Sequence, residues 1–366
     1  PSKEILEALP NLFKLEAREF YFFSKLDKIG WLKPLSDAGF FDPDKNPKPI
    51  KRPDGKGYSH PYWSALRYLE KITTKAEKGN LELVVAIIKK IIESRKDNSS
   101  SDYQIFKIIC ILPSERIAKE HIEFISEALI SNYHKSLISA DIGKLLVPKL
   151  IRDSNRPRLL ELIDVVTGFN INEGDISKTE IIFDEYWFSE LVDKTGQDVS
   201  TFSGIDLANL LIDKIMEIRK ANPRSFNVAF IPTIEDHKQH KFADRYESSL
   251  ARFLRTSLLH LAHSDARIIL EKLLKDKIDI LRRMTYFIIN KRYSEFSDLL
   301  WGLQYNPLEC IECKHELYEL FKDKAKEFDP KQIAQIIKWI EAVRFPHLKE
   351  EGRLLARFKK EWYSAL

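Results

Sequence analysis

The stretch that decides the fold runs from Trp31 to Leu69 and reads WLKPLSDAGFFDPDKNPKPIKRPDGKGYSHPYWSALRYL. Its first residues have the spacing of a short amphipathic helix, which Gly39 can end in the left-handed conformation. Five prolines and two glycines then fall between residues 42 and 61. Because proline fixes φ and removes a hydrogen-bond donor, we expect an ordered surface loop there and a return to helix after it.

The loop 42–61 is unusually long for a compact connection, which makes it a candidate docking loop. Large aromatic side chains flank it. Four of them are our predicted partner-binding residues: Trp31, Phe40, Phe41 and Trp63. The alternative is that the loop only covers the open end of the first helix pair.

Amphipathic helices dominate the chain on both sides of an irregular middle. We expect them at 60–77, 80–95, 101–111, 114–131, 138–151, 156–168, 204–221, 244–262, 264–275, 278–290, 293–303, 313–327, 330–341 and 348–365. Short turns join them into units of about 35 to 45 residues, the period of helical-pair repeats. We therefore predict an all-α fold, an α-solenoid of antiparallel helix pairs of the HEAT or armadillo type.

The rhythm breaks between residues 169 and 243, where turn formers flank a β-leaning patch. We predict a small β insertion near 170–184 and three regions. These are N-terminal helical repeats at 1–168, an irregular joint or insertion at 169–243, and HEAT-like repeats at 244–366. The chain lacks an initial Met and ends inside an expected helix, so we expect a fragment of a larger protein.

The composition favours a folded helical protein, with 44% hydrophobic residues, 31% charged residues and only 12 glycines. The net charge of +4 balances 59 basic against 55 acidic residues, which permits nucleic-acid binding without calling for it. No apolar run is long enough to cross a membrane. Three cysteines make no disulfide framework for a chain of this size, so we expect a reducing, cytoplasmic setting.

Signatures of catalysis are missing from the sequence. It contains no GxxxxGK[ST], no GxGxxG after a strand and no GxSxG. Cys310 and Cys313 resemble half of a zinc site, but no second ligand pair stands at a suitable spacing. We therefore predict a protein that is not an enzyme and that holds no metal or cofactor.

Four histidines leave a metalloenzyme open as a second alternative function. His260 and His263 lie three apart, which we interpret as one helical face, and His237 and His240 precede them. No HExxH motif accompanies them. Metal or catalytic chemistry here requires all four side chains to converge on one pocket.

Basic side chains support a first alternative, a HEAT-like nucleic-acid-binding module. Arg282 and Arg283 are adjacent, and Arg353 and Arg357 are four apart on the last helix. If these four arginines lie on one concave face, a phosphate backbone can follow it. The competing interpretation is the ordinary solvation of a helical surface, since acidic residues are interleaved throughout.

Two stretches resemble known families. Residues 274–288 have an acidic turn, a basic pair and an apolar helix, and so resemble the second helix of a HEAT repeat. Residues 20–70, with Phe22-Phe23, Ala38-Gly39-Phe40-Phe41 and Pro61-Tyr62-Trp63, resemble a segment of large bacterial proteins of the signal-transducing NTPase type that act in anti-phage (antiviral) defence. The resemblance implies a non-catalytic scaffold or sensor module for protein–protein recognition. We expect a protein partner, with nucleic acid as the alternative and no membrane.

Overall fold

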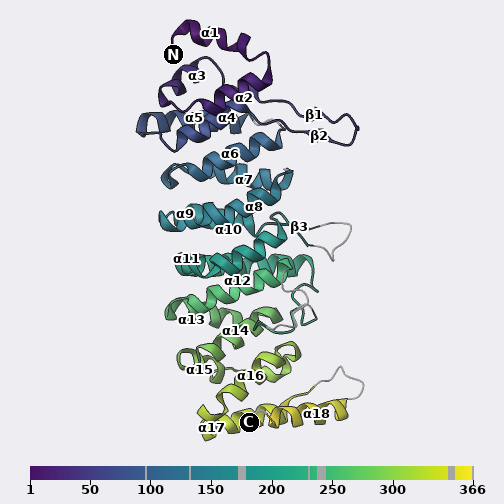
Figure 1. Cartoon of the computed structure of the whole chain (residues 1–366). Helices are drawn as coiled ribbons and strands as arrows, with labels where there is room; N and C mark the ends of the chain where they lie inside the picture. Colours follow the sequence, from purple (N-terminus) through teal and green to yellow (C-terminus); the bar gives the residue numbers. More distant parts are fainter. Residues whose placement is uncertain are drawn as a thin grey trace. The chain divides into compact units, whose positions relative to one another are not determined.

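The computed structural model describes residues 1–94, 97–131, 133–171, 179–229, 231–236, 245–344 and 351–364. Helices make up most of it, which confirms the all-α prediction (Figure 1). The chain forms two compact units, residues 1–168 with 182–187, and residues 169–181 with 188–366. The division into three regions and the solenoid arrangement stay predictions. Within the described ranges, no helix combines the length and the apolar character needed to span a bilayer.

The N-terminal unit is a succession of short helices with one two-stranded sheet. Its helices are α1 (Lys3–Leu12), α2 (Glu16–Lys25), α3 (Leu32–Asp37), α4 (Ser64–Thr73), α5 (Lys78–Glu93), α6 (Ser99–Ile111), α7 (Lys119–Ser131), α8 (Lys135–Asp141), α9 (Val147–Arg152) and α10 (Arg156–Val166). The strands β1 (Ile50–Lys51) and β2 (Tyr58–Ser59) pair antiparallel. Gly39, at φ +76°, follows α3 as predicted.

The core of this unit is built on α4. The apolar side chains of Leu66, Leu69 and Ile72 recur at helical spacing and are fully buried. The helix packs against α2, α5 and α6, and α7 in turn contacts α6, α8 and α10. Helix α4 therefore contacts both its neighbour in sequence and the next helix but one on each side, whereas α7 contacts its two neighbours and α10.

The C-terminal unit begins with a β-hairpin and continues in helices. The strands β3 (Phe169–Ile171) and β4 (Thr179–Ile181) pair antiparallel, at the place where the sequence predicted a β insertion. The helices are α11 (Glu185–Ala221, in this unit from Phe188), α12 (Tyr246–His260), α13 (His263–Leu274), α14 (Asp279–Lys291), α15 (Tyr293–Trp301), α16 (Lys314–Lys324), α17 (Pro330–Ala342) and α18 (Glu351–Tyr363). Gly204 interrupts α11 with φ +57°.

Helix α14 is the centre of the C-terminal unit. It contacts α12, α13, α15 and α16, and ten of its residues are buried. The apolar residues Leu281, Met284 and Ile288 recur at i, i+3 and i+7 and have no exposed surface. A helix that is buried on most of its faces must pair any charge it carries, which bears on the arginines described below.

Candidate functional site

Residues 46–61 form an arm that leaves the helices of the N-terminal unit as a β-hairpin (Figure 1). Its turn is closed by the N–H of Arg52, which donates to Gly57 O at 3.0 Å, and by the N–H of Gly55, which donates to Arg52 O at 3.0 Å. Gly55 and Gly57 have φ values of +70° and +97°, which glycine adopts at little cost. The prolines of the sequence predicted a loop here and not a hairpin, although Pro53-Asp54-Gly55 is a turn signal.

Both ends of the arm are held by one buried side chain, that of Asn98. Its Nδ2 donates to Asn46 Oδ1 at 3.2 Å, Pro47 O at 2.8 Å and Pro61 O at 3.0 Å. Its Oδ1 accepts hydrogen bonds from the first amides of α6, so the same residue caps that helix. Because residues 47 and 61 are joined through one amide group, the arm leaves the unit from a fixed base.

Two serines of α6 add to this anchor. Ser101 Oγ donates to Asn46 Oδ1 at 2.7 Å, and Ser100 Oγ donates to His60 O at 2.6 Å. Asn98, Ser100 and Ser101 are all buried. A buried polar network with its partners in place orders the groups that it connects. These hydrogen bonds therefore hold the base of the arm in one conformation.

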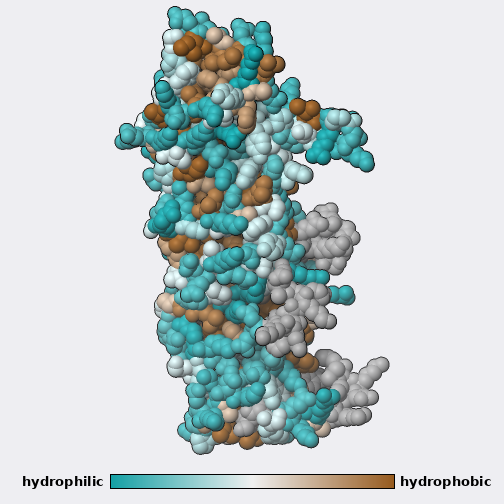
Figure 2. Space-filling model, in the orientation of Figure 1, coloured by the Kyte–Doolittle hydropathy of each residue, from teal (hydrophilic) through white to brown (hydrophobic). Residues whose placement is uncertain are grey.

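The rest of the arm is exposed and carries cationic and apolar side chains. Lys51 and Tyr58 are paired in register, so they share one face of the hairpin, and Ile50 lies on the other face. Ile50 and Tyr58 are 58% and 57% exposed. The cations are Lys48, Lys51, Arg52 and Lys56, and within the described part of the chain no carboxylate forms an ion pair with them. Figure 2 shows hydrophilic and hydrophobic side chains together on this projection.

A pocket of about 390 Å³ lies where the arm returns to the helices, lined by Phe20, Tyr62, Trp63, Arg67, Tyr103 and Lys107 among others. The Arg67 guanidinium lies 4.7 Å from the centroid of the Phe20 ring, within cation–π range. The backbone of Trp63 is held by Gln104, whose Oε1 accepts from Trp63 N at 2.9 Å and whose Nε2 donates to Trp63 O at 3.1 Å. The pocket thus continues the anchored base of the arm.

The far wall of the pocket carries a hydrogen-bonded phenol. Tyr103 Oη donates to Asp141 Oδ2 at 3.1 Å, and Lys107 Nζ lies 3.5 Å from the same oxygen. Burial, helped by the Asp141 carboxylate, raises the pKa of Tyr103 to about 12. Tyr103 is therefore a neutral donor at neutral pH. The hydroxyl proton of Tyr103 is engaged by Asp141, so the donors that the pocket offers a ligand come from Arg67 and Lys107, and Glu70 also lines the pocket.

The four aromatic residues predicted to bind a partner lie mostly inside the N-terminal unit. Phe41 and Trp63 are only 3% and 2% exposed. Trp31 and Phe40 are half-buried, with their rings against other aromatic rings. Only Trp63 lines the pocket. Phe41 and Trp63 are therefore core rings, which an aromatic-rich sequence does not distinguish from surface rings, and a binding role for Trp31 and Phe40 stays a prediction.

Three of the four predicted phosphate-binding arginines are paired with carboxylates. Arg282 pairs with Asp279 at 2.7 Å, and Arg357 pairs with Glu361 at 3.0 Å. The side chain of Arg353 lies outside the described part of the chain. The third paired arginine, Arg283, is buried beside Glu316.

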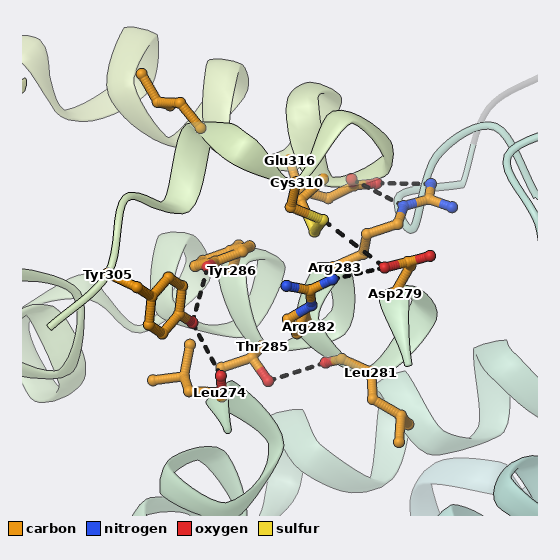
Figure 3. The surroundings of a disulfide bond; sticks show 12 residues. Leu274, Asp279, Leu281, Arg282, Arg283, Thr285, Tyr286, Tyr305, Cys310 and Glu316 are labelled. Carbon is orange, nitrogen blue, oxygen red and sulfur yellow. Dashed lines mark hydrogen bonds and ion pairs between the residues drawn. A yellow bond between two sulfur atoms is a disulfide. The ribbon is translucent and has the colours of Figure 1, made fainter. Parts of the chain in front are cut away.

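The Arg283 side chain is 1% exposed and has a structural role. It forms a bidentate ion pair with Glu316, at 3.0 Å and 2.9 Å (Figure 3). It also donates to Ile231 O at 2.8 Å and to Pro232 O at 3.0 Å. The pair therefore fixes an irregular segment onto α14 and α16. A phosphate cannot reach Arg283, which corrects its assignment as a binding residue.

The histidines do not share a helical face. His260 ends α12, with Nδ1 2.8 Å from Thr256 O, whereas His263 begins α13 and stacks on Phe296 at 5.2 Å. An extended break at Leu261 and Ala262 separates the two helices. His237 and His240 lie outside the described residues. The interpretation of His260 and His263 as one helical face is wrong.

The cysteines differ from the expected reduced state. Cys310 and Cys313 form a disulfide, and both are buried, while Cys110 is free and buried. Burial raises the pKa of the Cys110 thiol to about 12. The cytoplasmic setting stays a prediction.

Comparisons with known proteins suggest no role for the arm or the pocket. The chain matches no protein-family model, and neither a curated protein nor a solved structure is significantly similar to it.

Proposed function

We propose that the chain is a non-catalytic helical module that binds an acidic segment of a protein partner through the arm, residues 46–61, and the pocket beside it. The observation that carries the proposal is the fixed base of the arm combined with its exposed, unpaired cations. A binding element that is already ordered loses little conformational entropy on association. The rest of the unit then serves as a support that positions the arm.

The chemistry of the arm favours a protein over a bare polyanion. Lys51 and Tyr58 share a face, and Ile50 is exposed on the opposite one. Apolar anchors surrounded by polar and charged groups are typical of protein interfaces, where aromatic and arginine side chains dominate the binding energy. The partner that fits carries carboxylates beside apolar side chains.

The architecture supports the wider part of the proposal, an α-solenoid scaffold or sensor within a larger cytoplasmic bacterial protein, in phage defence. Helix α4 contacts α2 and α6, and α14 contacts α12 and α16. Contacts between alternate helices are expected of stacked helix pairs. The resemblance of residues 20–70 to defence proteins of the signal-transducing NTPase type motivates the biological setting.

Nucleic acid is the second candidate partner, for one reason. Tyr58 lies beside Lys51 on an exposed strand, and an aromatic ring next to a cation can stack on a base and neutralise a phosphate. From the sequence, this candidate depended on a face of four arginines. The pairing of Arg282, Arg283 and Arg357 with carboxylates removes most of its support.

The test is co-purification of the full-length parent protein from its own cells, with and without nuclease, followed by mass spectrometry. The test variant is the double charge reversal Lys51→Glu with Arg52→Glu. The control is Lys14→Glu, an exposed lysine of the same unit outside the arm. We expect a protein partner that survives nuclease, is lost with the double variant and is retained with the control. If nuclease treatment removes the partner from the unaltered protein, the result supports nucleic-acid binding. If the double variant still retains the protein partner, the arm does not bind it.

A further inference from the structure

Cys310 and Cys313 are adjacent to two carboxylates that come from different parts of the C-terminal unit. Cys310 precedes a short 3-10 turn, Ile311–Cys313, whose last residue is the second cysteine and which leads directly into α16. This turn packs against α14, whose first residue is Asp279. Figure 3 shows Asp279 directed toward Cys310. The second carboxylate belongs to Glu312, an exposed residue that lies between the two cysteines in the sequence.

The distances are those of a ligand cluster. Cys310 Sγ lies 3.9 Å from Asp279 Oδ1. One ligand atom each from Asp279, Cys310 and Glu312 lie within 4.8 Å of one another. Cys313 Sγ is bonded to Cys310 Sγ and so belongs to the same group. One sulfur and two carboxylates therefore converge, with the second sulfur bonded to the first, although 31 residues separate Asp279 from Cys310.

We propose that these four side chains form a zinc site when the disulfide is reduced. A dithiol reductant supplies two electrons and two protons, the Cys310–Cys313 bond breaks, and the reductant becomes a disulfide. On binding Zn²⁺, each thiol releases its proton to solvent and coordinates as a thiolate. A disulfide oxidant reverses the step: it takes two electrons from the two thiolates and, with two protons from solvent, becomes two thiols. The Cys310–Cys313 bond then re-forms, and the ion loses both sulfur ligands and is released. The site is thus a redox-gated metal site, independent of the arm.

The existing geometry needs little change to accept the ion. Zinc takes four ligands, with Zn–S of about 2.3 Å and Zn–O of about 2.0 to 2.2 Å, so tetrahedral ligand atoms lie about 3.3 to 3.8 Å apart. Asp279 Oδ1 is already close to that separation from Cys310 Sγ, at 3.9 Å, and the ligand atom of Glu312 lies within 4.8 Å of both. The two sulfurs only have to move apart once their bond is broken. Mixed thiolate and carboxylate ligands in a four-coordinate set favour zinc over magnesium or calcium, which prefer oxygen alone.

Arg282 completes the site as a positioning residue. Its guanidinium donates to Asp279 Oδ1 at 2.7 Å, the same oxygen that faces Cys310. Two thiolates and two carboxylates exceed the charge of one Zn²⁺ by two units, and a neighbouring guanidinium offsets part of that excess. Such outer contacts orient metal ligands and tune the site. Glu312 is exposed, so the ion has a path of entry from solvent.

The experiment uses the full chain, reduced with a phosphine and then freed of it without oxygen. Cobalt(II) is titrated first, because thiolate coordination gives a charge-transfer band, and zinc is then added in competition. We expect one cobalt ion per chain with that band, its displacement by zinc, and no binding by the oxidised chain. Cys313→Ser should abolish the band. Asp279→Asn and Glu312→Gln should each weaken cobalt binding at least about tenfold, since each removes a ligand.

Two controls make the result decisive. Cys110→Ser removes the free cysteine of the other unit, and Glu309→Gln removes an exposed acid near Cys310 that is outside the cluster. Both should bind cobalt as the unaltered chain does. The proposal is overturned if the reduced chain, with three titratable thiols and unchanged circular dichroism, shows no charge-transfer band. It is also overturned if the two carboxylate variants bind cobalt with unaltered affinity.

Discussion

Asn98 should control the stability of the arm more strongly than any single surface contact. It caps α6 and donates to three acceptors at the base of the arm. Loss of an N-cap costs about 1 kcal/mol. Leaving buried carbonyls without a donor costs about 1 to 3 kcal/mol more. The variant Asn98→Ala should therefore destabilise the base of the arm by about 2 to 4 kcal/mol.

Hydrogen exchange followed by mass spectrometry measures this loss locally. Opening free energies govern the exchange of protected amides, and each 1.4 kcal/mol is about a tenfold change. The informative peptides cover the arm and Trp63, whose amide donates to Gln104 in the interior. Asn98→Ala should speed their exchange by about 30- to 700-fold. Asn98→Ser keeps a capping oxygen but cannot reach the arm, and should recover only the capping term, about 1 kcal/mol.

The matched control is Asn155→Ala, which removes a second asparagine cap in the same unit. Asn155 caps α10 and donates to Ser114 O at 2.7 Å, away from the arm. It should loosen the start of α10 and leave exchange in the arm unchanged. If Asn98→Ala speeds exchange in the arm no more than Asn155→Ala does, the anchor does not hold the arm, and the reasoning is refuted.

Three further predictions concern other buried groups. Glu316→Gln should lower the free energy of unfolding by about 3 to 5 kcal/mol in urea titrations, because it leaves Arg283 buried without a counter-charge. Burial lowers the pKa of His121, whose Nδ1 accepts a hydrogen bond from Ala118 N at 2.9 Å. The free energy of unfolding should therefore be highest above about pH 6.5 and fall as the pH drops below it. A flat pH profile, or an equal fall in His121→Gln, contradicts this. Cys110 should resist iodoacetamide at about pH 8 in the folded chain and react in urea, since only the thiolate attacks, and rapid alkylation of the folded chain would show that the thiol is accessible.

Local patterns in the sequence predicted the helices, because helix formation depends on the spacing of apolar residues and on the residues that end each helix. The apolar spacing of Leu66, Leu69 and Ile72 predicts α4, and Gly39 ends α3 in the left-handed region as expected. The hairpin at 169–181 follows turn formers around a β-leaning patch. The break between α12 and α13 was predicted at residue 263, whereas it lies at Leu261 and Ala262, and for this reason the placement of His260 and His263 on one helical face was wrong.

Contacts between distant residues could not be predicted in the same way. Arg282 and Arg283 look like one basic pair, yet Arg283 is buried against Glu316, 33 residues later, and Arg282 holds Asp279. The sequence offers no second pair of cysteines or histidines at the spacing of a zinc site. The carboxylate of Asp279 comes close to Cys310 only because the turn 311–313 packs on α14. Spacing rules describe neighbours along a helix and contain no information on which helix packs against which.

The most direct test of the central claim, that the arm docks on a protein, is photo-cross-linking from position 58 in the native protein inside its own cells. Tyr58 is replaced by a photoreactive benzoyl-phenylalanine, and the control places the same group at Tyr186, an equally exposed tyrosine of the same unit outside the arm. The account predicts a nuclease-resistant cross-link from position 58 to an acidic stretch of a protein, and none to that protein from position 186. No cross-link from position 58, or one to nucleic acid alone, would contradict it.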